Sequence, residues 1–203
     1  DNDIYAYVTD RQIGSVNTLT RLPGGGWLGD NTDAWGFAAL ARRAGVDFAG
    51  KKTLVLGSGG TSKTVCTVVR QAGGTPVVVS RSGEVTYETI TSQTDAEILV
   101  NATPVGMYPR VDDQPVDLTR LPHIKAVLDV VYNPLRTRLL QQAQALGLRC
   151  AGGLYMLCGQ AARAAERFTG QAVPPEKLEA AYAALHRQSS NIALVGMPGS
   201  GKS

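Results

Sequence analysis

Four adjacent polar side chains open the segment GDNTDAWGF at residues 29–37: Asp30, Asn31, Thr32 and Asp33. Apolar residues then recur at the spacing of one helix face, up to an expected stop at Gly45. One interpretation is structural: Asn31 or Thr32 caps the helix, and Asp33 stabilises its first turn by about 0.3–1 kcal/mol. The other is that these side chains form a substrate site. These residues by themselves leave both interpretations open.

A glycine-rich stretch, VLGSGGTSKT, lies where a predicted strand meets a predicted helix. It has the form G-x-G-G, with Ser62 where the third glycine of G-x-G-x-x-G would stand. Glycines at such a turn let the backbone approach a pyrophosphate, and the helix amino end supplies free N–H groups. A plain tight turn is the alternative. The expected cofactor contacts of this turn are Gly57, Ser58, Gly59, Gly60 and Thr61.

The end of the second predicted strand indicates which dinucleotide would bind. An NAD site usually carries a carboxylate there for the ribose 2′-hydroxyl, whereas this chain has Ser80, Arg81 and Ser82. A guanidinium binds phosphate through two parallel hydrogen bonds, so this trio favours the 2′-phosphate of NADP(H). A solvated surface arginine is the alternative interpretation.

The elements that must position these residues alternate between short apolar strands and helical patterns. We expect strands at TLVLG (53–57), TPVVVS (75–80), EILVNA (97–102) and AVLDVVY (126–132). We expect helices at 61–73, 136–147, 154–170 and 174–188, with a short or poor helix within 81–96. Residues 12–20 are expected to be extended, and 22–30 to be rich in turns. This order predicts an α/β fold with a Rossmann-like parallel sheet covered on both faces.

The predicted elements divide the chain at about residues 45, 150 and 188. Residues 46–150 would form the Rossmann domain that binds NADP, helices follow in residues 151–188, and residues 189–203 would form a linker and a further motif. The first residues do not resemble a signal peptide. The sequence begins without an initiator Met, so we expect a fragment at the front end.

Composition excludes several classes of function. The 203 residues are 43% hydrophobic and 18% charged with a net charge of +3, so neither nucleic acid nor membrane is the expected partner. Three widely spaced cysteines predict reduced thiols in a cytoplasmic protein. The two histidines lie far apart, and we expect no metal site. The expected partner is a small-molecule substrate, while the oligomeric state stays open.

Six stretches occur in one characteristic order: GSVNTLT, GDNTDAWGF, VLGSGGTSKT, LVNATPVGM, DVVYNPLRTRLL and GLYMLCGQAARAAERFTG. Together, from about residue 13 to residue 187, they closely resemble shikimate dehydrogenase. This family interconverts 3-dehydroshikimate and shikimate with NADP(H), in aromatic amino acid biosynthesis. The resemblance therefore implies a nicotinamide-dependent oxidoreductase. It also implies that residues 1–45 are the C-terminal part of a substrate-binding domain, and that the helices in residues 151–188 return to that domain.

The resemblance also implies roles for particular residues. Four would contact the substrate: Asn17, Asp33, Tyr132 and Gln160. In the family, the aspartate pairs with a lysine as the acid/base unit. Further cofactor contacts, several of them beside the nicotinamide, would be Asn101, Thr103, Met107 and Gly153. Taken alone, Tyr132 fits a core position and Gln160 an exposed helix face.

The sequence departs from the family pattern at two places. The family's catalytic lysine and its serine pair lie upstream of VNT, and this sequence has no lysine before Lys51. We therefore expect these 203 residues alone not to turn over substrate. Many relatives carry a second basic residue shortly after the arginine, where this chain has Gly83, Glu84 and Val85. A softer preference for NADP, a quinate/shikimate dehydrogenase, or a non-catalytic metabolite-sensing module are the alternatives.

The final residues carry another motif. NIALVGMPGSGKS combines an apolar strand with G-x-x-x-x-G-K-S over residues 196–203, which is a P-loop signature whose backbone N–H groups and lysine cradle phosphates. The stretch resembles the opening of shikimate kinase and implies a fusion of two consecutive enzymes. We expect this tail to be disordered and to have no kinase activity of its own.

Overall fold

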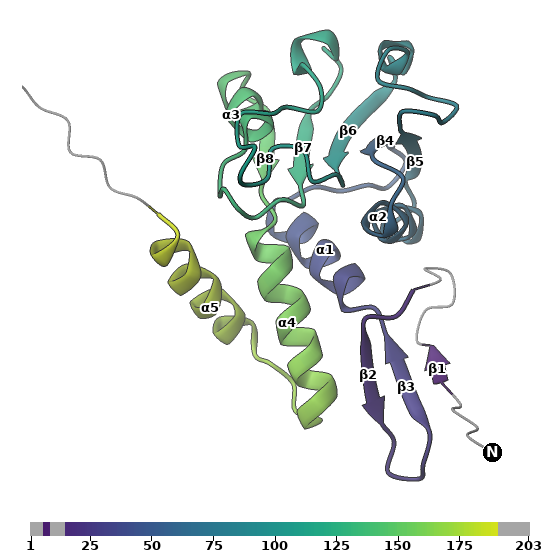
Figure 1. Ribbon diagram of the computed structural model, residues 1–203, viewed down its shortest axis with the longest axis vertical. Coiled ribbons are helices and arrows are strands. Elements are labelled where there is room, and N and C mark those ends of the chain that lie inside the picture. The colour runs from purple at the N-terminus through teal and green to yellow at the C-terminus, as the bar shows by residue number, and fades with distance from the viewer. Residues whose placement is uncertain (1–5, 9–14, 191–203) are drawn as a thin grey trace, which may run out of the picture.

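The computed structural model describes residues 6–8 and 15–190, which form two β-sheets with helices between and around them (Figure 1). The P-loop motif lies outside the described residues. The larger sheet has five parallel strands in the order β5-β4-β6-β7-β8. Its strands are β4 (Lys52–Leu56), β5 (Thr75–Val79), β6 (Ala96–Asn101), β7 (Ala126–Asp129) and β8 (Arg149–Ala151). The predicted Rossmann-like parallel sheet is thereby confirmed.

Side chains alternate across this sheet and build two cores, one on each face. Val55 and Val100 pack into a cluster with residues of α1 (Thr32–Arg43), α2 (Gly60–Gln71) and α4 (Leu154–Thr169). Leu54 and Leu99, one residue earlier on the same strands, pack into a second cluster with α3 (Arg138–Ala145). Because both faces are covered, the strands are continuously apolar, as the sequence predicted.

The predicted helices form close to their expected bounds. The last of them, α5 (Pro175–Gln188), begins at a proline as a first helical turn allows. Four glycines with positive φ follow the ends of α1, α2, α3 and α4 as predicted: Gly45, Gly73, Gly147 and Gly170. In the threonine-rich segment 81–96, the only helical turn is the 3-10 turn η1 (Ile90–Ser92). A second 3-10 turn, η2 (Leu118–Arg120), lies between β6 and β7.

Each of the two sheets corrects one of our expectations. The smaller sheet has the order β1-β3-β2, built from β1 (Ala6–Val8), β2 (Thr18–Arg21) and β3 (Trp27–Asp30). Residues 27–30 were expected to be part of a turn, but the turn is confined to residues 22–26, so β3 pairs antiparallel with β2. The edge strand β8 was not expected either, because three residues are too few to show a pattern.

Helices α1 and α4 cross with almost nothing between their backbones. A Cβ added at Gly36 would lie 2.5 Å from the Met156 carbonyl oxygen, and one added at Gly159 would lie 3.1 Å from the Gly36 Cα atom. Figure 1 shows α1 and α4 side by side between the large sheet and the β2–β3 hairpin. The buried core of α1 is continuous with that of β4 and α2 across the proposed division at residues 45 and 46.

Candidate active site

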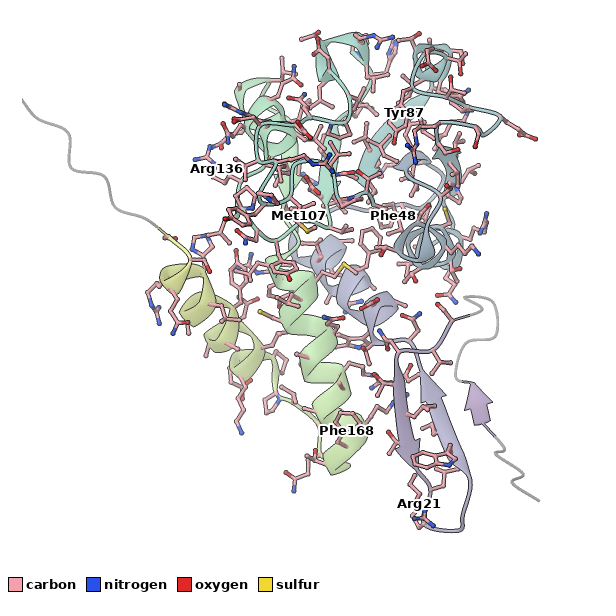
Figure 2. The ribbon with its side chains drawn as sticks, viewed as in Figure 1. Arg21, Phe48, Tyr87, Met107, Arg136 and Phe168 are labelled. Carbon is pink, nitrogen blue, oxygen red and sulfur yellow. The ribbon has the colours of Figure 1, made fainter. Side chains whose placement is uncertain are left out.

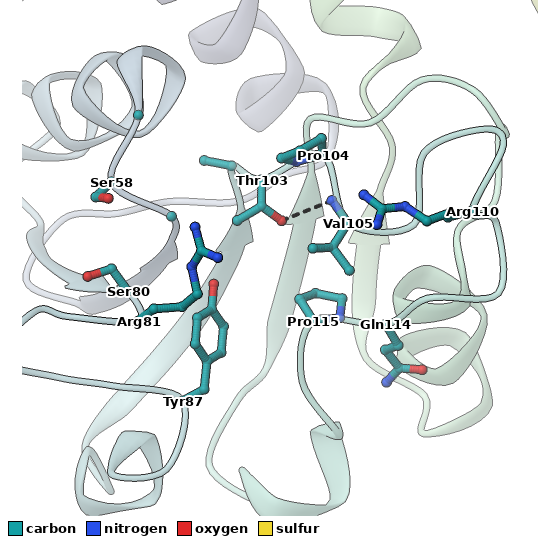
Figure 3. Close-up of a pocket in the computed structure, with 13 residues that line it drawn as sticks. Ser58, Ser80, Arg81, Tyr87, Thr103, Pro104, Val105, Arg110, Gln114 and Pro115 are labelled. Carbon is teal, nitrogen blue, oxygen red and sulfur yellow. Dashed lines mark hydrogen bonds between the residues drawn. The ribbon is translucent and has the colours of Figure 1, made fainter.

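A cleft of about 620 Å³ opens at the carboxyl edge of the five-stranded sheet, beside β4, β5 and β6 (Figure 3). The strand order reverses at β4: the next strand in the chain, β5, lies on one side of β4, and β6, β7 and β8 lie on its other side. Ligands of open α/β sheets bind at this kind of switch point, outside the carboxyl ends of the strands. The cleft is lined by Gly57, Ser58, Gly59, Ser80, Arg81, Tyr87, Ala102, Thr103, Pro104, Val105, Arg110, Gln114 and Pro115.

The turn from β4 into α2 is shaped by its glycines. Gly57 has a φ of +102°, and a Cβ there would lie 2.9 Å from the Thr103 side chain. Gly59 is the N-cap of α2 and has no side chain to bond the first N–H groups of the helix. A Cβ at Gly59 or Gly60 would meet nothing within 4 Å. The turn therefore offers exposed backbone N–H groups beside open space, a cradle that fits a pyrophosphate.

The opposite side of the turn is formed by the end of β5. Ser80 is buried and its N–H donates to the Val85 carbonyl oxygen at 3.1 Å, which folds the following loop back. Arg81 is exposed, and Figure 3 shows its guanidinium beside the Tyr87 ring, directed into the cleft. Burial raises the pKa of the Tyr87 phenol, and the Arg81 charge partly offsets this rise. Sequence reasoning missed Tyr87, since a lone tyrosine in a threonine-rich loop carries no local signal.

A network of buried polar side chains fixes the loop after β6, which forms another wall of the cleft. The Asp129 carboxylate at the end of β7 accepts from Thr137 Oγ1 at 2.7 Å, from Asn101 Nδ2 at 3.0 Å and from the Val131 N–H at 3.0 Å. Asn101 Oδ1 in turn accepts from the hydroxyl and the N–H of Thr103. Burial raises the pKa of Asp129 to about 6. The network fixes the loop after β6 against β7, with Thr103 lining the cleft.

The other residues proposed for the cofactor do not line the cleft. Thr61 is half-buried on the first turn of α2, and Ser82 is exposed in the loop after β5. Met107 is 41% exposed, and Asn101 is fully buried within its network. Gly153 lets the start of α4 approach β7: its N–H donates to the Val131 carbonyl oxygen at 2.9 Å, and a Cβ there would collide with the Val130 carbonyl oxygen.

Asn17 and Asp33, which are 16 positions apart in the sequence, meet at the start of α1. The Asn17 side chain donates a hydrogen bond to the Asp33 carboxylate, while its Oδ1 accepts from the Thr32 N–H at 2.9 Å. Partial burial raises the pKa of Asp33 above its ordinary value, and the Asn17 hydrogen bond lowers it in part. The capping function belongs to Asn31, whose Oδ1 accepts from the Ala34 N–H at 3.2 Å. Asp33 is therefore not needed as a cap.

Asp30, the first carboxylate of the polar run, is structural. It is buried and pairs with two arginines of α4, Arg163 and Arg167, which ties β3 to that helix. Gln160 lies between these arginines and the helix crossing, and its side chain is half-buried. Tyr132 is 47% exposed on the loop after β7, so it is not the core residue that it would be by default.

Residues 6–8 and 15–190 contain no group of three or more histidine, cysteine or acidic side chains placed to hold a metal ion. In that same part of the chain, every helix is too short or too polar to cross a lipid bilayer.

Comparison with known proteins decides the family. A family model described as the shikimate 5′-dehydrogenase C-terminal domain matches residues 153–181. The NADP(+) shikimate dehydrogenase of Symbiobacterium thermophilum is 35% identical, over 91% of this chain and 73% of the relative. The chain belongs to the shikimate dehydrogenase family.

Solved structures of shikimate dehydrogenases have the same fold. A chorismate mutase/shikimate 5-dehydrogenase fusion protein from Clostridium acetobutylicum matches with a TM-score of 0.85 and 28% identity, over 92% of this chain and 72% of that one. Shikimate 5-dehydrogenase from Thermus thermophilus, in complex with NADP(H) and shikimate, matches with a TM-score of 0.75 and 33% identity, over 88% and 72%. The α/β architecture of this shikimate dehydrogenase family member is therefore that of its relatives.

Proposed function

We propose that the chain binds NADP(H) in the cleft and serves the reversible reduction of 3-dehydroshikimate to shikimate. The observation that carries this proposal is the cleft itself, which has an open glycine turn on one side and Arg81 on the other. The names of the relatives, and the NADP(H) and shikimate in the Thermus thermophilus complex, support it. The nicotinamide would supply the hydride, so the protein has to bind, orient and handle the proton.

For the cofactor, we assign the pyrophosphate to the turn of residues 57–60, where a substituent at Gly59 would point into open space. The 2′-phosphate would lie against Ser80 and Arg81, since Arg81 is the cation directed into the cleft from the end of β5. Thr103 would border the nicotinamide half. Asn101 and Gly153 would act through the backbone that they hold, and Thr61, Ser82 and Met107 would reach the cofactor only at its edges.

For the substrate, we assign the ring hydroxyls to Asn17 and Asp33, the hydrogen-bonded pair at the start of α1. Hydride transfer to a ketone leaves a developing alkoxide, which needs a proton from a positioned acid. The partly buried Asp33 carboxyl has a raised pKa, which favours sharing a proton with a substrate hydroxyl. Tyr132 and Gln160 would contribute further polar contacts from the loop after β7 and from α4.

Equilibrium binding tests the cofactor assignment. Isothermal titration calorimetry of the chain with NADPH and NADH should show tighter binding of NADPH, and Arg81→Gln should remove most of that difference. The matched control is Arg120→Gln, which removes an exposed arginine outside the cleft. If NADPH does not bind, or if NADH binds more tightly, the NADP(H) assignment is wrong; tighter NADH binding would favour a quinate/shikimate dehydrogenase.

Shikimate binding to the NADP(+)-saturated chain tests the substrate assignment. Asp33→Asn should weaken this binding at least tenfold, because a carboxylate that accepts a ring hydroxyl is lost, while NADP(+) affinity stays unchanged. An unchanged affinity for shikimate would refute the role of Asp33. Our expectation that these 203 residues do not turn over substrate is checked separately, by NADPH formation at saturating shikimate.

We further infer from the resemblance to shikimate kinase that the P-loop motif at residues 196–203 belongs to a second, ATP-binding unit of the same polypeptide. The fusion protein among the structural relatives supports this only by analogy, since its partner is a chorismate mutase. A cytoplasmic location would suit the three free thiols of the described residues, Cys66, Cys150 and Cys158. The reading frame after Ser203 tests the fusion: it should encode the rest of a kinase.

A further inference from the structure

The cofactor cleft carries a second arginine that has no part in the proposed cofactor contacts. Arg110, on the loop after β6, lines the wall opposite Arg81, and Figure 3 shows the two guanidinium groups approaching the cleft from opposite sides. Among the lining residues there is no aspartate or glutamate. The cleft therefore presents two positive charges to its contents, and no lining carboxylate neutralises them.

The base of the Arg110 loop is fixed, although the arginine itself is not. Figure 2 labels Met107, three positions before Arg110 on the same loop. Gln114 Nε2 donates to the Val116 carbonyl oxygen at 2.7 Å and also to Gln142 Oε1 on α3. The Arg110 side chain is 78% exposed, and its ion pair with Asp113 is a loose contact of 3.7 Å. An exposed pair of this kind is worth little, so Arg110 can leave it for a more strongly charged partner at small cost.

The wall formed by β5 supplies only one cation to a phosphate. After Arg81 and Ser82 come Gly83, Glu84 and Val85, so this loop has no second basic residue, and Glu84 adds a negative charge. A 2′-phosphate brings nearly two negative charges and three acceptor oxygens into the cleft, more than one guanidinium satisfies. A second cation on the opposite wall would neutralise the remaining charge and donate the remaining hydrogen bonds.

We propose that Arg110 is a specificity-determining residue, the second cation that favours the 2′-phosphorylated cofactor over its unphosphorylated form. This inference rests on the proposed binding of NADP(H) in the cleft. The preference for NADPH is then divided between two walls, one built from the end of β5 and the other from the loop after β6. The attraction is electrostatic, so it weakens as salt concentration rises.

The test measures NADPH and NADH dissociation constants for the wild type, Arg110→Gln and a matched control, Arg138→Gln. Arg138 is exposed and paired with Asp112, a neighbour of Asp113, but it does not line the cleft. Arg110→Gln should weaken NADPH binding about fivefold, the effect of one exposed charge-assisted contact, and NADH binding less than about 1.5-fold. Arg138→Gln should change neither constant by more than about 1.5-fold.

Each other outcome has a definite meaning. Equal weakening of NADPH and NADH binding by Arg110→Gln would place the arginine on the base or the pyrophosphate and overturn its role in specificity. Unchanged binding of both would overturn any contact. Asp113→Asn gives an independent reading: freeing Arg110 should tighten NADPH binding about twofold. If the wild type fails to bind NADPH at all, the proposed function falls and this inference with it.

Discussion

Replacement of the buried Asp129 by asparagine is expected to change how stability depends on pH. The carboxyl group is fully buried between β6, β7 and the start of α3, and burial raises its pKa from the ordinary 3.8 to about 6. Asparagine keeps the shape and an acceptor oxygen but has no titrating proton. The comparison therefore isolates one ionisation within the network that holds the loop after β6.

The sign follows from proton binding. Between pH 3.8 and about 6, the folded state holds a proton on Asp129 that the unfolded chain has released. Stability from this group is therefore complete below pH 3.8 and is lost as pH rises through about 6, after which it changes no further. At about 1.4 kcal/mol for each pH unit, the loss amounts to about 3 kcal/mol. The unfolding free energy of the wild type, minus that of Asp129→Asn, should thus fall by about 2.4 kcal/mol between about pH 4 and pH 7, because part of the loss has already occurred at pH 4.

Urea unfolding at half-unit steps from about pH 4 to pH 7.5, followed by circular dichroism, measures this difference in free energy. Asp117→Asn is the control with opposite sign, because the exposed Asp117 carboxylate accepts from the Thr119 N–H and its pKa is lowered. A wild-type minus Asp129→Asn difference that stays constant with pH, or that rises, would refute the claim that burial dominates the ionisation of Asp129.

Two further substitutions test the close backbone approaches. Gly57→Ala should cost about 2–4 kcal/mol of unfolding free energy, since its φ of +102° is strained for any other residue and the new methyl would clash within the cleft; Gly60→Ala, in open space on the first turn of α2, should cost less than about 0.5 kcal/mol. Equal costs in urea unfolding would contradict this reasoning. Gly36→Ala should cost about 2 kcal/mol net, because separating α1 from α4 outweighs the gain of about 1 kcal/mol in helix propensity. A thermal midpoint equal to that of the wild type would contradict the close crossing.

The parallel sheet was predictable because its strands are long apolar runs separated by helical patterns. Gly57 and Arg81 were predictable as cleft residues for the same reason: each follows such a strand closely. The strand β8 was not, since its three residues gain their conformation only by pairing with β7. A short strand that forms only because it pairs with a neighbouring strand has no recognisable pattern in its own sequence.

The residues of the candidate site were likewise only partly predictable from the sequence. Asn17 and Asp33 were grouped only through a family resemblance, and no local pattern joins residues that meet through the β2–β3 hairpin and the start of α1. Asp30 and Asp33 look equivalent in the sequence. Their roles separate because Arg163 and Arg167 reach Asp30 from α4, more than a hundred positions away along the chain. Long-range charge pairing of this kind cannot be inferred from spacing.

The glycine-to-glycine crossing of α1 and α4 also limits how the two halves of the protein can move. With Gly36 and Gly159 in near contact, neither helix can slide along or roll on the other without a collision of main chains. Asp33 and Gln160 must therefore travel together, and the ion pairs of Asp30 add the β2–β3 hairpin to the same stiff body. Any motion of this body against the large sheet would have to bend the chain at residues 44–51 and 152–153, and would also have to separate the core that α1 shares with β4 and α2.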